Sequence, residues 1–287
     1  MPTPKISVLM PVYKTDKRHL KEAIESILQQ TFSDFEFLIL DDCPEDSRED
    51  VVKSFNDKRI KYFKNEKNLG ITKARNKLID MAKGEYLAVF DHDDLSMPTR
   101  FEKQVQFLDE NADCGVVGCN IESFPQKRRI KQPIENHEIK LALMTQCVIA
   151  HSSAMIRKQV LVKNNVRYRE EYSPSEDYAL WCDLIKFTNF HNIPEVLFKW
   201  RDHKANTSKT QDEKMKEATL RIHAEMQTNF PTLYNEFLLK ATQKRSFYLL
   251  GFIPLVRFET IGYKTKVLLF NKILIATYKK SIKLKGV

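Results

Sequence analysis

Glycine and paired cysteines are scarce in this sequence. Seven of its 287 residues are glycine, and no glycine-rich segment ends in a lysine, which argues against a glycine-rich phosphate-binding loop. The cysteines are odd in number and widely scattered, without Cys-x-x-Cys spacing: Cys43, Cys114, Cys119, Cys147 and Cys182. This pattern excludes a zinc ribbon, and we expect free thiols in a reducing cytoplasm.

Long apolar runs are also missing. The longest run, from Phe247 to Val256, has about half of the roughly 20 residues that a membrane-spanning helix needs. Residues 1–5 lead directly into a strand-like segment, without the apolar stretch of a signal peptide. We therefore expect a cytoplasmic protein.

Basic residues are concentrated near the C-terminus. The formal net charge is +9, from 47 Lys and Arg against 38 Asp and Glu. Residues 240–287 hold eleven of the basic residues and one of the acidic residues, so this segment carries +10 and residues 1–239 carry −1. The charge belongs to a basic tail, and we expect no nucleic-acid partner.

Apolar segments alternate with amphipathic ones over the first two thirds of the chain. Strands are expected at Ile6–Val12, Phe35–Leu40, Ile60–Phe63, Glu85–Phe90, Cys114–Ile121, His151–Ile156 and Val196–Trp200. Helices are expected at residues 17–30, 47–55, 72–82, 98–110, 175–187 and 212–244. Strands separated by helices of this length predict an α/β fold with a mostly parallel sheet and right-handed crossovers.

Three carboxylates lie within four positions after one of these strands. Asp91, Asp93 and Asp94 follow the apolar run that ends at Phe90. Carboxylates held this closely repel one another unless a cation balances them, and oxygen ligands suit Mg²⁺ or Mn²⁺, which in turn bind phosphate oxygens. A solvated acidic turn before the helix near Pro98 explains the same residues equally well. The cluster alone leaves both interpretations open.

Further motifs follow one another in a fixed order. They are Ser7–Tyr13, Gln29–Phe32, Asp41-Asp42, Asn68-x-Gly70 with Ala74-Arg75-Asn76, Asp91-x-Asp93-Asp94 with Pro98 and Arg100, His151-Ser152-Ser153, Ser175–Tyr178 with Trp181, and Arg201-x-His203. With this order and spacing, residues 5–208 resemble the family 2 glycosyltransferases of the glycosyltransferase A-type fold. The resemblance is greatest to bacterial enzymes that build lipopolysaccharide, lipooligosaccharide or capsule. It implies a Rossmann-like, mostly parallel sheet flanked by helices.

The resemblance also implies a nucleotide site. The matching positions are Pro11, Val12, Tyr13, Asp41, Asp42, Asn68, Arg75, Asp91 and His92. Tyr13 would lie against the base, Asp42 would accept a hydrogen bond from a uracil ring, and Arg75 would hold the nucleotide. Without the resemblance, a packed aromatic ring, a helix-capping carboxylate and a surface charge are the ordinary explanations of these three residues.

For the reaction itself, the resemblance implies an inverting transfer from a UDP-sugar. Asp93 would be the principal ligand of Mn²⁺ or Mg²⁺ on the diphosphate, with His203 beside the metal. Asp91 would meet the ribose or the donor sugar, and Asp177 would be the general base that deprotonates the acceptor hydroxyl. His92 stands where relatives often carry a small residue, and it is either a bystander or a change to the metal shell.

The expected domain organisation is a catalytic domain at 1–208, a helical region at 209–245 and a basic apolar tail at 246–287, so the chain ends in a helical, basic extension. The tail combines apolar and cationic residues, which suits either an anionic membrane surface or a packed subdomain or homodimer contact. The expected acceptor is a glycan or lipid-linked glycan. A metal-dependent nucleotidyltransferase and a non-catalytic glycan-binding relative are the alternatives.

Overall fold

The computed structural model describes residues 3–203, 206–241, 243–249, 253–261, 264–269 and 272–279. The chain forms two compact units, Met1–Glu225 and Met226–Val287, which are described separately. The predicted domain limits at 208 and 245 stay a prediction. Several residues of the expected basic, apolar tail lie outside the described residues, among them Leu250, Phe252, Lys280, Lys283 and Lys285.

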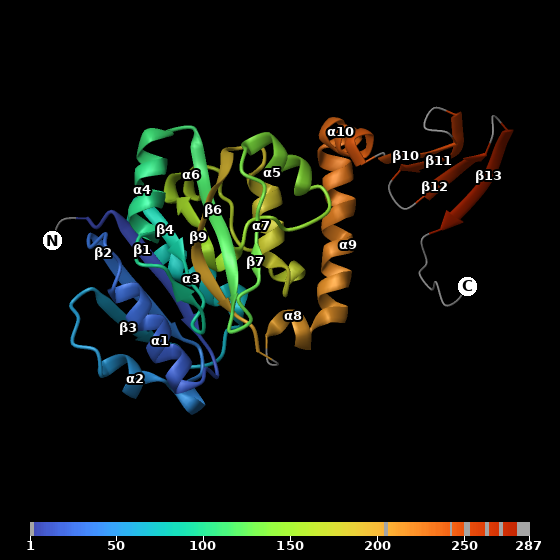
Figure 1. Ribbon diagram of the computed structural model, residues 1–287. Helices are drawn as coiled ribbons and strands as arrows, with labels where there is room; N and C mark the ends of the chain where they lie inside the picture. Colours follow the sequence, from blue (N-terminus) through green and yellow to red (C-terminus); the bar gives the residue numbers. More distant parts are fainter. Residues whose placement is uncertain are drawn as a thin grey trace. The chain divides into compact units, whose positions relative to one another are not determined.

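The first unit is built on one large sheet with helices against it (Figure 1). Its strands are β1 (Ile6–Val12), β2 (Phe35–Asp41), β3 (Ile60–Lys64), β4 (Tyr86–Val89), β5 (Leu95–Ser96), β6 (Cys114–Phe124), β7 (Arg129–Ile130), β8 (Met155–Arg157) and β9 (Asn189–Arg201). Their spatial order is β3-β2-β1-β4-β8-β6-β9-β5, and β7 pairs with β6.

The N-terminal half of this sheet is parallel. β1 pairs in parallel with β2 and with β4, and β2 pairs in parallel with β3. Every residue of β1 and β2 is buried, as expected for strands covered on both faces. The register places Val12 beside Asp41 and Leu9 beside Val89. The carboxyl ends of these strands therefore meet at one edge, as the sequence predicts.

The other half of the sheet is mixed. β8 runs antiparallel to both β4 and β6, whereas β9 is parallel to β6 and antiparallel to β5. β9 is much longer than the expected strand at Val196–Trp200. It delivers Arg201 to the segment that follows β4, because its end pairs with β5.

The helices of the first unit are α1 (Lys17–Leu28), α2 (Glu49–Lys53), α3 (Ile71–Met81), α4 (Arg100–Glu110), α5 (Asn136–Ala142), α6 (Lys158–Lys163), α7 (Glu176–Leu184), α8 (Thr207–Thr210) and α9 (Asp212–Asn229, of which residues 226–229 belong to the second unit). The observed α1, α3, α4 and α7 agree closely with the expected ranges, whereas the sequence predicts none of α5, α6 and α8. α1 begins where Asp16 accepts hydrogen bonds from the amides of Arg18 and His19. Its buried residues recur at helical spacing.

Three expectations need correction. The strand expected from His151 is a 3-10 turn, His151–Ser153, followed by the short strand β8. The helix expected from residue 47 begins at Glu49, because the Asp41 carboxylate accepts from Ser47 Oγ and the Arg48 amide. The long helix expected at 212–244 is divided into α9 and α10, and Pro231 starts the second helix.

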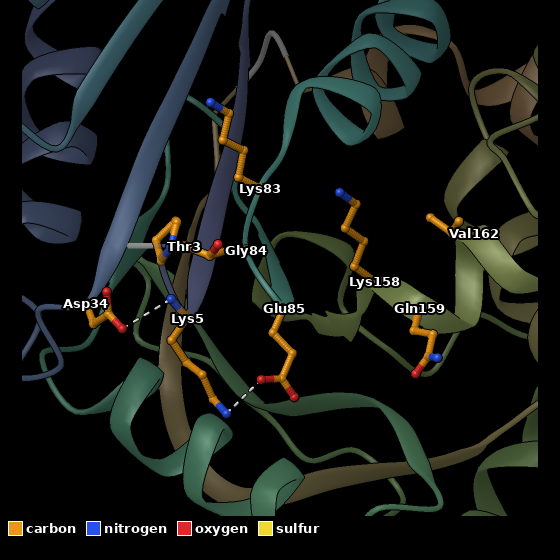
Figure 2. Close-up of a pocket in the computed structure, with 10 residues that line it drawn as sticks. Thr3, Lys5, Asp34, Lys83, Gly84, Glu85, Lys158, Gln159 and Val162 are labelled. Carbon is orange, nitrogen blue, oxygen red and sulfur yellow. Dashed lines mark hydrogen bonds and ion pairs between the residues drawn. The ribbon is translucent and has the colours of Figure 1, made fainter. Parts of the chain in front are cut away.

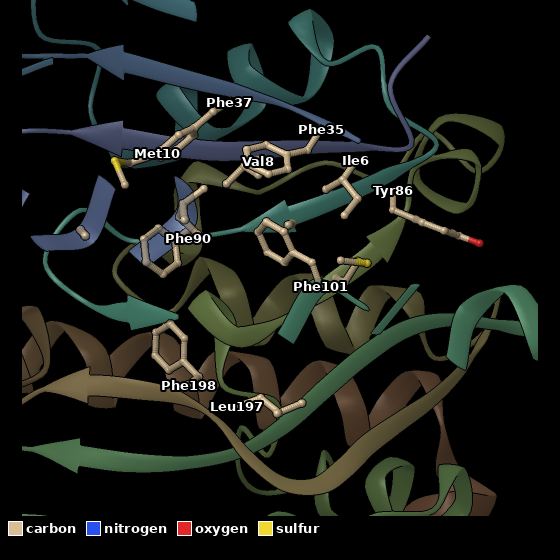
Figure 3. Close-up of a cluster of buried hydrophobic side chains, with 14 of the residues drawn as sticks. Ile6, Val8, Met10, Phe35, Phe37, Tyr86, Phe90, Phe101, Leu197 and Phe198 are labelled. Carbon is tan, nitrogen blue, oxygen red and sulfur yellow. The ribbon is translucent and has the colours of Figure 1, made fainter. Parts of the chain in front are cut away.

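Aromatic side chains dominate the core beside the strand ends. Phe90 and Phe198 pack edge to face with ring centroids 6.1 Å apart, and Phe35 meets Phe101 at 5.7 Å. Figure 3 shows these rings together with Ile6, Val8 and Met10 of β1. The core thus reaches the residue immediately before Asp91, so the acidic segment starts from a rigid support.

The second unit contains α10 (Pro231–Ala241) and a four-stranded antiparallel sheet. The strands follow in chain order: β10 (Gln243–Leu249), β11 (Ile253–Ile261), β12 (Lys264–Leu269) and β13 (Lys272–Lys279). The sequence predicts none of them. Among the described residues, no helix has the length and apolar character needed to cross a membrane.

Candidate active site

The residues singled out in the sequence gather at the carboxyl edge of the parallel strands. The Asp42 amide donates to Val12 O at 2.8 Å, and the Phe90 amide donates to Leu9 O at 3.1 Å. These bonds continue the β1–β2 and β1–β4 pairing past the ends of the strands. Tyr13, Asp42 and Asp91 are therefore held around the end of β1, where open α/β sheets bind ligands.

Asp41 and Asp42 organise loops as well as lining this edge. Asp41 has no exposed surface, and its carboxylate accepts from the backbone amides of two loop residues and from two hydroxyl groups: Cys43, Arg48, Ser47 and Tyr62. Three of these bonds go to Oδ2 and one goes to Oδ1, and the buried carboxylate presents no surface to a ligand. The contribution of Asp41 to the site is therefore to hold the loop after β2.

The Asp42 carboxylate fixes the turn before α3. It accepts from the amides of Leu69 and Gly70, each at 2.9 Å, and from Asn65 Nδ2 at 2.7 Å. Asn68 Nδ2 donates back to Asp42 O at 3.0 Å. Gly70 has φ +83°, a conformation that favours glycine. Three bonds leave Asp42 one further acceptor position for a ligand.

Tyr13 is the exposed aromatic residue of this edge. Its relative exposure is 42%, whereas Pro11 and Val12 are buried and present mainly backbone. Lys14, with Nζ 5.1 Å from the centroid of the Tyr13 ring, lies against the ring. An exposed ring beside a buried carboxylate is a suitable platform for a planar base.

Arg75 joins two carboxylates at the centre of the site. Its guanidinium donates to Glu176 Oε1 at 2.5 Å and to Asp91 Oδ1 at 3.1 Å, while Ser152 Oγ donates to Asp91 Oδ2. Burial alone would raise the pKa of Asp91, but Arg75, His151 and Ser152 outweigh it and lower this pKa to about 2. Asp91 is therefore ionised, and Arg75 is held by two anions rather than exposed as a surface charge.

Asp177 follows Glu176 in the first turn of α7, and its pKa is shifted in the opposite direction from that of Asp91. Burial, with the neighbouring Glu176 carboxylate, raises the pKa of Asp177 to about 6. One of its oxygens accepts from the Tyr178 amide at 2.7 Å. A partly exposed carboxylate with a pKa near neutrality can take a proton at physiological pH.

A second group of residues brings Asp93 to His203. His203 Nε2 and Asp93 Oδ2 are 2.8 Å apart, although 110 residues separate them. Arg201 donates from Nε to Asp93 O at 2.6 Å and from its amide to Asp94 Oδ1 at 2.7 Å. Burial and the Asp93 carboxylate raise the pKa of Asp94 well above its usual range. Asp94 thus holds the end of β9 through the Arg201 amide, whereas the Asp93 carboxylate lies beside the His203 imidazole.

This pair has the chemistry of a partial metal shell. One carboxylate and one imidazole suit Mn²⁺, and such metals commonly complete their shells with phosphate oxygens and water. Across the described parts of the chain, no group of three or more His, Cys, Asp or Glu side chains could hold a metal by itself. Asp93 and His203 therefore fit a metal that a diphosphate ligand brings with it.

Several supporting residues carry no assigned role in the sequence analysis. Glu22 of α1 accepts from Arg201 Nη2 at 2.6 Å. Arg100, fully buried, donates to Val89 O and Ser152 O and so joins the end of β4 to the turn at 151–153. Position in the family-like motifs could have drawn attention to Arg100. Nothing local in the sequence indicates Glu22.

Two histidines near the site, His92 and His151, each have a buried ring nitrogen without a hydrogen-bond partner. Burial, with the nearby Arg75, lowers the pKa of His151 to about 3, and its Nε2 lies 2.7 Å from Tyr168 Oη. The Nδ1 atoms of His151 and His92 are buried without a hydrogen-bond partner. His92 lies between Asp91 and Asp93, and its unpartnered Nδ1 has no access to solvent.

The open cleft in Figure 2 lies at the opposite edge of the sheet, beside the amino ends of β1 and β4. It measures about 490 Å³, and its lining includes Lys5, Gly84, Lys158 and Val162. Lys5 pairs there with Glu85 and with Asp109. None of the predicted site residues lines this cleft.

Comparisons with known proteins show the family of this chain. Residues 7–165 match the model of Glycosyl transferase family 2. An uncharacterized glycosyltransferase of Methanocaldococcus jannaschii is 35% identical over 216 residues, covering 70% of this chain and 72% of the relative. The O-antigen biosynthesis glycosyltransferase WbnJ of Escherichia coli is 32% identical, covering 71% and 82%. The putative glycosyltransferase EpsE of Bacillus subtilis is 37% identical, covering 69% and 73%.

Solved structures support the fold. TarS of S. aureus (residues 1–349), crystallised with UDP-GlcNAc, superposes with a TM-score of 0.67 at 20% identity, covering 82% of this chain and 71% of that chain. The mannosyltransferase PcManGT of Pyrobaculum calidifontis, in complex with GDP-Man and Mn²⁺, gives 0.61 at 15% identity, covering 84% and 71%. The expected glycosyltransferase A-type fold is confirmed.

Proposed function

Because the chain belongs to glycosyl transferase family 2, we propose that it transfers a sugar from a UDP-sugar to a hydroxyl group of a glycan acceptor, with inversion at the anomeric carbon. The observation that carries the proposal is the division of acidic residues into two groups. Asp177, with its raised pKa, lies with Arg75, Asp91 and Glu176, whereas Asp93 lies with His203. One group suits proton transfer and the other suits a diphosphate-bound cation.

In the proposed reaction, the acceptor oxygen forms a bond to the anomeric carbon while the bond from that carbon to the diphosphate oxygen breaks. The acceptor proton passes to the Asp177 carboxylate, and UDP leaves with the bonding electron pair. An inverting displacement needs the base on the face of the sugar opposite the leaving group. The ionised Asp91, fixed by Arg75 and Ser152, is available to orient donor hydroxyl groups.

Asp93 and His203 would hold the metal, and their neighbours keep them in place. A divalent cation bound there would neutralise the charge that develops on the departing diphosphate. Arg201 donates to the backbone carbonyl of Asp93, and Glu22 accepts from Arg201 and so holds it in place. Tyr13 and Asp42 support a uracil base, since they offer an exposed ring and one remaining acceptor position.

The donor can be tested by measuring UDP release. The full-length protein is incubated with UDP-Glc, UDP-Gal, UDP-GlcNAc or UDP-GalNAc, with GDP-mannose as the competing donor class, in Mn²⁺ and in EDTA. We expect turnover of one UDP-sugar that EDTA abolishes and that Asp93→Asn reduces strongly. Asp80→Asn is the control, because Asp80 is exposed on α3. Preference for GDP-mannose, or equal rates in EDTA, would overturn the proposal.

We also propose that the second unit brings the enzyme to an anionic membrane surface on which lipid-linked acceptors lie. The strand register places Lys244 beside Glu259 and Glu259 beside Lys266, and it places Lys264 beside Lys279. The four strands of this sheet carry seven lysine and arginine residues against one acidic residue, Glu259. Basic residues near such a surface each contribute about 1 kcal/mol.

Sedimentation with anionic liposomes tests this second proposal. Lys264→Glu/Lys266→Glu should weaken binding at low salt, and high salt should weaken binding of the wild type. Lys58→Glu/Lys163→Glu changes the charge equally at exposed positions of the first unit and serves as the control. No binding by the wild type at low salt, or equal loss in both variants, would refute membrane attachment and favour a packed subdomain or homodimer contact.

A further inference from the structure

Helix α9 contacts the segment that carries Asp177 at several points. Ser175, which directly precedes α7, has its Oγ 3.4 Å from Met215 O of α9. Arg221 Nη2 donates to Glu171 O, and the Arg221 guanidinium lies 5.2 Å from the centroid of the Tyr172 ring. Both ends of the segment 171–175 are therefore attached to α9.

Among the residues of α9, Glu225 makes the most hydrogen bonds in this contact. One of its oxygens accepts from Tyr172 Oη, and the other accepts from Arg169 Nη2 at 2.9 Å. Glu225 and Arg221 are one turn apart on α9, so they reach the same ring. Tyr172 is buried, with 5% exposure, and the Arg169 guanidinium stacks 4.3 Å from its centroid.

Arg169 extends the contact to the far end of α7. Its Nη2 donates to Asp183 Oδ1 at 3.1 Å as well as to Glu225. The Tyr172 carbonyl also accepts from the Ser175 amide at 2.6 Å, immediately before Glu176 and Asp177. Thus α7 is tied to Glu225 through Tyr172 at its start and through Arg169 at its end.

We propose that Glu225 is a positioning residue for the base Asp177, an inference that rests on the proposed function of Asp177. α7 has nine residues, too few to be stable without tertiary contacts. The contacts that residues 169–175 make with α9 therefore set the orientation of its first turn. Glu225 lies outside residues 7–165, to which the family match is confined.

The test compares two substitutions of the same kind on one helix. Glu225→Gln removes the charge that holds Arg169, whereas Glu217→Gln changes an exposed residue of α9. Tyr172→Phe removes the hydroxyl group alone. We expect Glu225→Gln and Tyr172→Phe to lower kcat about tenfold, the scale of a displaced catalytic group. The donor KM and the affinity for UDP should stay within about twofold of the wild type, because the residues proposed to hold the base and the metal, Tyr13, Asp42, Asp93 and His203, are not part of α7.

Hydrogen exchange measured by mass spectrometry gives a readout independent of turnover. Amides of residues 170–182 should exchange faster in Glu225→Gln than in Glu217→Gln, while the β1 and β2 amides stay equally protected. Unchanged exchange in 170–182, or a kcat equal to that of Glu217→Gln, would overturn the proposal. So would a loss of kcat that only parallels a loss of folded protein. If the wild type releases no UDP from any donor, the proposed donor fails, and the exchange comparison still decides the role of Glu225.

Discussion

Replacing Arg75 by methionine would leave Asp91 and Glu176 without the cation that now bridges them. The pKa of Asp91 is lowered from 3.8 to about 2, and one pKa unit corresponds to about 1.4 kcal/mol, so its pairing stabilises the fold by roughly 2 kcal/mol at neutral pH. The Glu176 side chain, 5% exposed, adds a second buried pair. Removing one partner of a buried pair costs about 3–5 kcal/mol. Because the Asp91 side chain is 32% exposed, we expect a loss near the lower end, about 3 kcal/mol.

The stability difference between Arg75→Met and the wild type should also change with pH in a defined direction. In the wild type, the lowered pKa of Asp91 gives stability that is present above pH 3.8 and is lost as pH falls toward 2. In Arg75→Met, burial without a cation would raise the pKa of Asp91 above its unfolded value. The charged form of Asp91 then destabilises the variant at pH 7, and protonation relieves this as pH falls toward 5. The stability gap between variant and wild type should therefore narrow on acidification.

Urea unfolding followed by tryptophan fluorescence measures this gap, because Trp181 is fully buried on α7. Arg18→Met serves as the control: the Arg18 side chain is 77% exposed, and its pairing with Glu22 spans 4.0 Å. We expect the control to lose less than about 0.5 kcal/mol. A loss below about 1 kcal/mol for Arg75→Met at pH 7, or a gap that widens toward pH 5, would refute the role given to Arg75.

Three further outcomes are expected. Asp177→Asn should keep UDP affinity and lower kcat about 10²-fold or more, and in the wild type kcat should rise with pH through about 6, where Asp177 loses its proton; a flat profile from pH 5 to 8 would contradict the base assignment. His203→Ala should weaken Mn²⁺ binding in the presence of UDP about tenfold by calorimetry, whereas equal affinity would leave Asp93 as the sole protein ligand. Gly84→Ala should lower the Tm, since a Cβ would lie 2.4 Å from Ser7 N; an unchanged Tm would show that the turn can move.

Local patterns predict the strand ends well and the supporting contacts poorly. Apolar runs that end in polar residues locate Val12, Asp41 and Phe90, and the parallel sheet then brings their neighbours together. The same pattern does not distinguish a carboxylate that faces a ligand from one that holds a loop. Asp41 and Asp42 are adjacent in the sequence, yet Asp41 accepts four hydrogen bonds from its own loop and Asp42 accepts three from the turn before α3.

Contacts between distant residues leave no periodic signal. Glu22 is one of two acidic residues of α1, and its bond to Arg201 spans 179 positions. Glu225 likewise occurs in a helix with many charged residues, and its partners lie more than 50 positions earlier.

The antiparallel strand in the mixed half of the sheet could not be predicted either. β8 is three residues long, too short for its direction to be predicted from hydrophobic alternation.

The long separations around Asp93 have a consequence for synthesis on the ribosome. The parallel strands β1 to β4 are complete once residue 89 has emerged, so this half of the sheet can begin to form early. Asp93, by contrast, must wait for His203, and Glu22 must wait for Arg201. A nascent chain that stops before β9 is finished has its acidic segment without the cationic and imidazole groups that restrain it. The proposed site for a diphosphate-bound cation is therefore completed in one late step of translation, after most of the first unit has been made.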